Sequence, residues 1–152
     1  MIETETKVAE VKITYSPKIK QSERQGITGS RDAERIFREK MPDGVIEHRE
    51  VMLLMLLNRA QKVLGVAKVS EGGVSGTVAD PKIIFQFALK TNASNIILCH
   101  NHPSGNLKPS EADRQLTKKL AEGGKVLDIP LLDHIIIIPD SGYLSFADEG
   151  LM

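Results

Sequence analysis

His100 and His102, two histidines separated by one residue, are the side chains of this sequence best placed to bind a metal ion. They follow the apolar run at residues 95–99, which predicts a short buried strand. Side chains two apart on a strand share a face, with Cα atoms about 6.6 Å apart, so both imidazoles can converge on one ion. Asp113 adds a carboxylate in the first turn of the next predicted helix. This ligand set leaves a fourth tetrahedral position open for water, as in catalytic zinc sites.

The same residues also have a purely structural interpretation. A His-x-His pair is more often a partly buried strand end, and Ser110 with Asp113 fits a capping box at the start of a helix. The two interpretations can coexist, because Ser110 could cap the helix and still turn its hydroxyl toward a metal-bound species. We favour a metal site because the histidines leave a strand, Pro103 turns the chain at once, and the carboxylate stands at the adjoining helix start.

The elements that must position these residues alternate between strand and helix. Apolar periodicity, helix caps and turn residues predict helices at residues 31–40, 81–91 and 110–122, and strands at 50–57, 62–70, 95–99, 131–139 and 143–146. Gly123 and Gly124 are expected to end the third helix in a left-handed cap. The result is an α/β fold, a mixed sheet flanked by helices.

The predicted domain covers residues 31–152. Residues 1–30 form an amino-terminal extension with a peripheral strand over residues 8–15, and residues 70–77 are expected to form a flexible loop. A length of 152 residues fits one domain of this kind.

Composition limits the classes of partner. Lysine plus arginine and aspartate plus glutamate both number 20, so no overall basic field attracts nucleic acid or an anionic membrane, and any nucleic-acid role must be local. The single cysteine excludes an internal disulfide framework, and the first residues lack the apolar stretch of a secretion signal, which favours the cytoplasm. The longest apolar run, at residues 51–57, is far below the roughly 18 to 20 residues needed to cross a bilayer.

The spacing of the candidate site resembles a known motif. The JAMM motif of the JAB/MPN metalloprotease superfamily is matched at every defined position, by His100, His102, Ser110 and Asp113. The turn Pro-Ser-Gly after the histidines and the segment LLDHIII at residues 131–137 look like the RadC branch. The resemblance covers roughly residues 31–152 and implies a cytidine-deaminase-like JAB/MPN fold.

The resemblance also implies roles for individual residues. Zn²⁺ is held by the two histidines and the aspartate of the motif, and Ser110 steadies the tetrahedral intermediate. An upstream glutamate acts as general base, and the motif context selects Glu50 rather than Glu47, a choice that the residues alone leave open. The implied function is a zinc-dependent hydrolase, a metallopeptidase or isopeptidase that acts on a peptide or protein substrate with a glutamate-activated, zinc-bound water.

Two other metal-dependent activities, a nucleoside deaminase and an HNH nuclease, fit the sequence less well. A zinc nucleoside deaminase needs His-x-Glu and Pro-Cys-x-x-Cys, and neither is present. The letters His-Asn-His at residues 100–102 suggest an HNH nuclease, but the residues of that motif are not consecutive. The serious alternative is a non-catalytic, metal-binding accessory module linked to DNA repair or mobile elements. The sequence has no counterpart of the amino-terminal helix-hairpin-helix region of fuller RadC members, and Lys118-Lys119 is thin support for phosphate contacts.

Several further residues stay open between structural and functional roles. His134 could donate to a carboxylate behind the metal ligands, but a core residue is the favoured interpretation, and the same holds for Asp133. Cys99 is expected in the core, on the face of its strand opposite the first histidine. Asn101 and Ser104 could orient a substrate, although Ser104 is equally a turn former.

Overall fold

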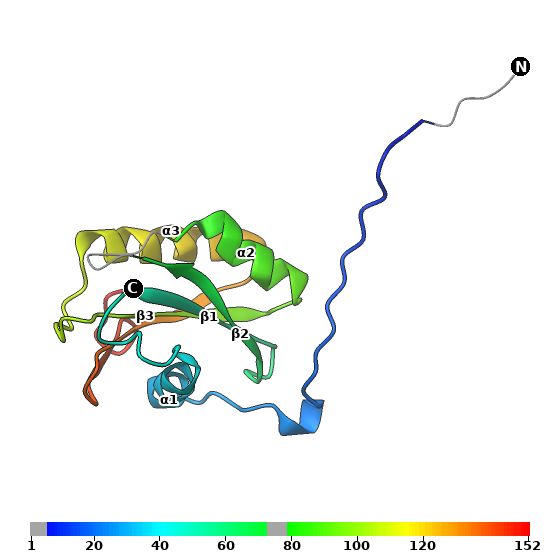
Figure 1. Ribbon diagram of the computed structural model, residues 1–152. Helices are drawn as coiled ribbons and strands as arrows, with labels where there is room; N and C mark the ends of the chain where they lie inside the picture. Colours follow the sequence, from blue (N-terminus) through cyan, green and yellow to red (C-terminus); the bar gives the residue numbers. More distant parts are fainter. Residues whose placement is uncertain (1–5, 73–78) are drawn as a thin grey trace, which may run out of the picture.

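A five-stranded sheet lies at the centre of the protein, with helices on both of its faces (Figure 1). The structure is a computed structural model that describes residues 6–72 and 79–152. The strand order is β2-β1-β3-β4-β5, for β1 Val51–Leu57, β2 Val63–Glu71, β3 Asn95–Asn101, β4 Leu131–Ile137 and β5 Tyr143–Ser145. β3 and β4 are parallel, and all other neighbours are antiparallel. The predicted α/β fold with a mixed sheet is confirmed.

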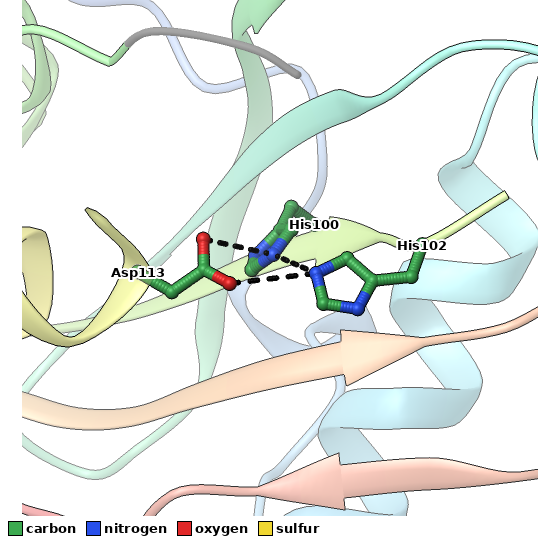
Figure 2. Close-up of side chains that lie close together, drawn as sticks. All are labelled: His100, His102 and Asp113. Atoms are coloured by element: carbon green, nitrogen blue, oxygen red, sulfur yellow. Dashed lines mark hydrogen bonds and ion pairs between the residues drawn. The ribbon is translucent and has the colours of Figure 1, made fainter. Parts of the chain in front are cut away.

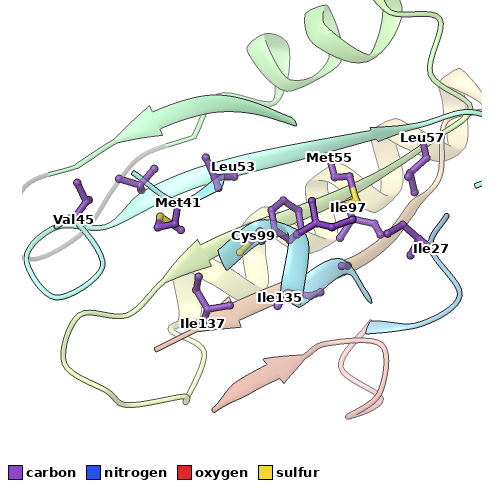
Figure 3. Packing of buried hydrophobic residues seen from close by; sticks show 14 residues of the cluster. Ile27, Met41, Val45, Leu53, Met55, Leu57, Ile97, Cys99, Ile135 and Ile137 are labelled. Carbon is purple, nitrogen blue, oxygen red and sulfur yellow. The ribbon is translucent and has the colours of Figure 1, made fainter. Parts of the chain in front are cut away.

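The central strands are apolar on both faces because both faces are covered. Helix α1, Ser30–Lys40, lies on one face, and α2, Pro81–Lys90, and α3, Glu111–Leu127, lie on the other (Figure 1). Side chains of β1 alternate between two buried clusters, with Leu53 and Met55 on the α1 side and Leu54 on the α2 side. Figure 3 shows the first of these clusters. A strand that is buried on both faces has apolar residues at consecutive positions, as β1 does.

The connection from β3 to β4 fixes the position of the candidate site. The two strands are parallel, so the chain must cross over between them, and it does so through α3. The carboxyl end of β3 therefore faces the amino-terminal end of α3, an arrangement in which open α/β sheets commonly bind ligands. Within the described ranges, no helix combines the length and apolar character that crossing a membrane requires.

Helix α3 continues beyond its predicted end. A Cβ atom at Gly124 would lie 2.4 Å from the carbonyl oxygen of Ile129, and one at Gly123 would lie 2.9 Å from the ring of Phe85. The two glycines therefore allow close packing, and the prediction that they end the helix is wrong. The left-handed cap is instead Asp128, with a φ of 58°.

The peripheral strand predicted at residues 8–15 does not form. The predicted alternation is present in the sequence, but the segment pairs with no strand among the described residues, and Val8, Val11 and Ile13 are 80%, 87% and 79% exposed. A strand needs a partner to satisfy its backbone hydrogen bonds. Pairing with the sheet begins later, at the bridge between Gly26 and Lys62.

The loop predicted at residues 70–77 begins later than expected, because β2 continues to Glu71. Ser70 and Glu71 end β2, where they pair with Met52 and Val51 of β1. The part of the predicted loop from residue 73 onward lies outside the described residues. The other predicted strands and helices agree with the observed bounds to within a few residues.

Candidate metal centre

The two histidines and the aspartate come together at the carboxyl end of β3 (Figure 2). His100 lies within β3 and His102 directly follows it, so their side chains fall on the same face of the sheet, toward α3. Asp113 lies in the first turn of α3. His100 is fully buried, and the side chains of His102 and Asp113 are only 11% and 13% exposed. The sequence-predicted ligands thus share a nearly closed site.

The spacing of the three side chains fits a tetrahedral metal ion. Zinc ligands lie about 2.0 to 2.2 Å from the ion, which places two ligand atoms about 3.3 Å apart in a tetrahedron. The Nε2 atoms of His100 and His102 are 2.9 Å apart, and they lie 3.3 and 3.4 Å from the two oxygens of Asp113. The two imidazoles and the carboxylate therefore lie close enough together to hold one metal ion.

Asp113 serves two purposes in this arrangement. One of its oxygens accepts a hydrogen bond from the backbone N–H of Ser110 at 2.8 Å, while the Ser110 hydroxyl oxygen accepts from the backbone N–H of Asp113 at 3.0 Å. This is a complete capping box. The structural and metal-binding interpretations of these residues therefore coexist, and the cap holds the carboxylate in the direction of the histidines.

The orientation of His102 is set by the turn that follows it. Its Nδ1 atom lies 2.6 Å from the carbonyl oxygen of Asn106, which can only accept, so Nδ1 carries the proton and Nε2 is left to face the site. The turn depends on Gly105, whose φ of +82° favours glycine. Ser104 accepts from the backbone N–H of Asn106 at 3.3 Å, so it acts as a turn former.

The carboxylate and the imidazoles of the site shift each other's pKa values toward the charged forms. Burial is the largest influence on the pKa of Asp113 and would raise it, but the imidazoles facing its oxygens and the N–H of Ser110 outweigh burial and hold this pKa well below its usual range. Burial is also the largest influence on the pKa of His102 and lowers it. The hydrogen bonds with Asp113 and Asn106, and the charges of Asp113 and Glu50, outweigh burial, and the pKa of His102 is raised from 6.5.

We expect metal affinity to fall as the pH is lowered through the raised pKa of His102. Below this pKa a proton occupies Nε2, and a metal ion must displace it, whereas Asp113 stays ionised. Competition with one proton predicts about a tenfold loss of apparent zinc affinity per pH unit. Titrations against a chelator of known affinity, at a series of pH values, measure this slope. An affinity that is constant from the alkaline to the acid side of 6.5 would contradict it.

Glu50 lies beside the site, at the start of β1. In the register of β1 and β3, Met52 pairs with His100, so extending it by two residues brings Glu50 opposite His102. Its charge is close enough to raise the pKa of His102. Within the described part of the chain its carboxylate has no hydrogen-bond or ion-pair partner, whereas Glu47 is exposed in the preceding turn.

Asn101 fastens the segment that carries Glu50. Its side chain points to the sheet face opposite the histidines and is fully buried. The amide oxygen accepts from the N–H of Val51 at 2.8 Å, and the amide nitrogen donates to the carbonyl oxygens of Ile46 and Arg49 at 3.0 and 2.9 Å. Asn101 therefore positions the strand start rather than a substrate. In the sequence, this role of Asn101 is indicated only by the position of the residue between the two candidate ligands.

His134 is buried as predicted, but it is more than a core residue. Its Nε2 atom lies 2.8 Å from Nδ1 of His100, a contact that sequence reasoning missed because it had sought a carboxylate partner. The neighbouring Asp133 is structural, since it accepts from the Ser145 hydroxyl at 2.6 Å and from the N–H of Ala147 at 3.0 Å. Cys99 lies in the core on the α1 side, as predicted, where burial raises the pKa of its thiol.

Comparison with known proteins places this site in a family. The sequence model of the RadC-like JAB domain matches residues 27–151. A UPF0758 protein of Flavobacterium johnsoniae is 45% identical over 125 residues, which cover 82% of this chain and 53% of that protein. A UPF0758 protein of Porphyromonas gingivalis is 44% identical over 129 residues, covering 85% of this chain and 56% of the relative. The chain thus spans about half the length of these relatives, and it belongs to the family of RadC-like JAB domains.

Proposed function

We propose that this domain is a zinc-dependent hydrolase of the JAMM type, a metallopeptidase or isopeptidase that cleaves a peptide or protein substrate. The observation that carries the proposal is the convergence of His100, His102 and Asp113: the two Nε2 atoms are 2.9 Å apart, and each lies 3.3 to 3.4 Å from a different oxygen of the carboxylate. Glu50 beside these groups adds a carboxylate that has no hydrogen-bond or ion-pair partner among the described residues.

The residues of the site divide the steps of hydrolysis between them. Zinc, when bound, polarises the substrate carbonyl and acidifies a water molecule. The Glu50 carboxylate takes a proton from the attacking water and later returns it to the leaving amine, so one group serves both steps. The Ser110 hydroxyl oxygen already accepts from the N–H of Asp113, while its own proton has no acceptor among the described residues. That proton is available to the oxyanion that develops on the substrate carbonyl.

A metal-removal experiment tests the proposal. The purified protein is stripped with a chelator, reloaded with one equivalent of Zn²⁺ or left metal-free, and each form is incubated with a mixed peptide library and an isopeptide-linked conjugate. We expect cleavage by the zinc form alone, restored each time that zinc is returned. Stoichiometric zinc binding without cleavage of either substrate would instead favour the non-catalytic module, and the absence of zinc binding would refute both.

A further inference from the structure

His134 stands directly behind the candidate ligand His100. It lies on β4, next to β3, and its side chain faces α3 like that of His100. The ring is fully buried, with one nitrogen against His100, the other against the hydroxyl of Thr117 on α3, and one face stacked on Phe146 at 4.6 Å. The ring is therefore held on three sides, by two polar contacts and one aromatic contact.

The direction of the hydrogen bonds at Thr117 can be deduced from its partners. The Thr117 hydroxyl lies 2.8 Å from the carbonyl oxygen of Asp113, and because a carbonyl cannot donate, the hydroxyl proton is used there. In the 2.7 Å contact with Nδ1 of His134, the hydroxyl oxygen must then accept, so Nδ1 of His134 carries a proton.

The same reasoning continues to the metal ligand. A hydrogen bond needs one donor and one acceptor, and neither nitrogen of the His134 ring faces an anion that would hold a second proton on it. With its proton on Nδ1, the Nε2 atom of His134 can only accept, so the 2.8 Å hydrogen bond is donated by Nδ1 of His100. The Nε2 atom of His100 is then the nitrogen that faces the site, where a proton or a metal ion can bind between it, Nε2 of His102 and Asp113.

We propose that His134, held by Thr117, is a positioning residue that keeps His100 in the tautomer and ring orientation required for metal binding. The chain of contacts starts at the backbone carbonyl of Asp113 and ends at the imidazole of His100, so it links two candidate ligands through the core. This inference rests on the metal site of the proposed function and is independent of the reaction carried out there. Groups behind a ligand typically contribute 10- to 100-fold to metal affinity.

Three variants separate this role from simple packing. His134→Phe keeps a ring against Phe146 but leaves the N–H of His100 unpaired, so we expect zinc affinity to fall 10- to 100-fold. His134→Gln offers an amide oxygen to His100 and an amide N–H to Thr117, and should retain affinity to within a few-fold. Thr117→Val removes only the hydroxyl that holds the His134 tautomer, and should weaken binding by about tenfold.

Thr91→Val is the matched control for the threonine variant. The Thr91 hydroxyl makes the same type of hydrogen bond to a carbonyl four residues earlier, Phe87, at 2.8 Å, but it lies at the end of α2, away from the ligands. We expect its zinc affinity to equal that of the unaltered protein. Equal affinity for the phenylalanine and glutamine variants, with no loss in Thr117→Val, would show that His134 only fills space.

Nuclear magnetic resonance tests the inference without metal or activity. Long-range ¹H–¹⁵N correlation spectra of the metal-free protein distinguish a proton on Nδ1 of a histidine ring from one on Nε2. We expect His134 to carry its proton on Nδ1 and to lose this preference in Thr117→Val. A proton on Nε2 of His134 in the unaltered protein would overturn the inference, even if zinc binding and cleavage were both observed.

Discussion

Replacing Asp113 with asparagine should weaken zinc binding by more than 100-fold in a protein that still folds. The substitution removes a negative charge from the ligand set, and a direct ligand should matter more than the 10- to 100-fold typical of groups behind one. The asparagine oxygen can still accept from the N–H of Ser110, so the capping box that begins α3 survives. We expect the free energy of unfolding of the metal-free protein to fall, because the side chain loses the attraction of its charge to the two imidazoles and to the helix start.

Glu111→Gln is the matched control for this prediction. Glu111 lies in the same first turn of α3, is exposed, and has the same favourable interaction with the helix dipole. Its neutralisation removes only the interaction with the helix dipole and should leave zinc affinity unchanged. If chelator competition gave equal affinities for both variants, Asp113 would be a helix cap and not a ligand.

Replacing Glu50 with glutamine should lower the rate of peptide cleavage by about 10²- to 10⁴-fold, the usual contribution of a general acid or base. Glutamine has nearly the same shape but cannot take a proton from water. Glu50 is half-buried at a strand start and lies near His102 without contacting the other ligands, so zinc affinity should stay within a few-fold. The measurement is turnover of a peptide cleaved by the unaltered protein, with zinc content determined on the same sample.

Glu47→Gln provides the comparison that the sequence alone could not make. Glu47 is exposed in the turn before β1, and its neutralisation should leave turnover unchanged. Loss of activity in Glu47→Gln, or full activity in Glu50→Gln, would show that Glu50 is not the general base. Both variants together decide whether the residue opposite His102 is the proton carrier.

The fold could largely be predicted because its signals are local. The run at Val51–Leu57 is apolar on both faces, and a strand of this kind must lie between two layers. Asp80 caps α2 by accepting from the N–H of Lys82 at 2.9 Å, as the Asp-Pro pair indicates. The two wrong predictions concern segments whose structure depends on residues far away in the chain. The alternating segment at residues 8–15 has no partner strand in the part of the chain that the structure describes, and Gly124 faces Ile129 instead of ending a helix.

The candidate metal site also has a part that the sequence predicts and a part that only the tertiary structure shows. The sequence by itself determined the ligand types, their spacing and the strand-turn-helix unit that carries them, because His100, His102 and Asp113 lie within one short segment. It could not determine what stands behind them, since His134 is 34 residues from His100 in the chain and reaches it only through the parallel pairing of β3 and β4.

The tertiary structure alone decided how Glu50 comes to lie beside the ligands. The pairing of β1 with β3 sets it opposite His102, and the buried amide of Asn101, 50 residues from Val51 in the chain, fixes the start of that strand. Neither contact leaves a periodic signal in the sequence, because each joins segments whose separation is set by sheet pairing. The sequence thus determined which groups could hold a metal ion, and the sheet decided which side chains orient these groups and which glutamate lies beside them.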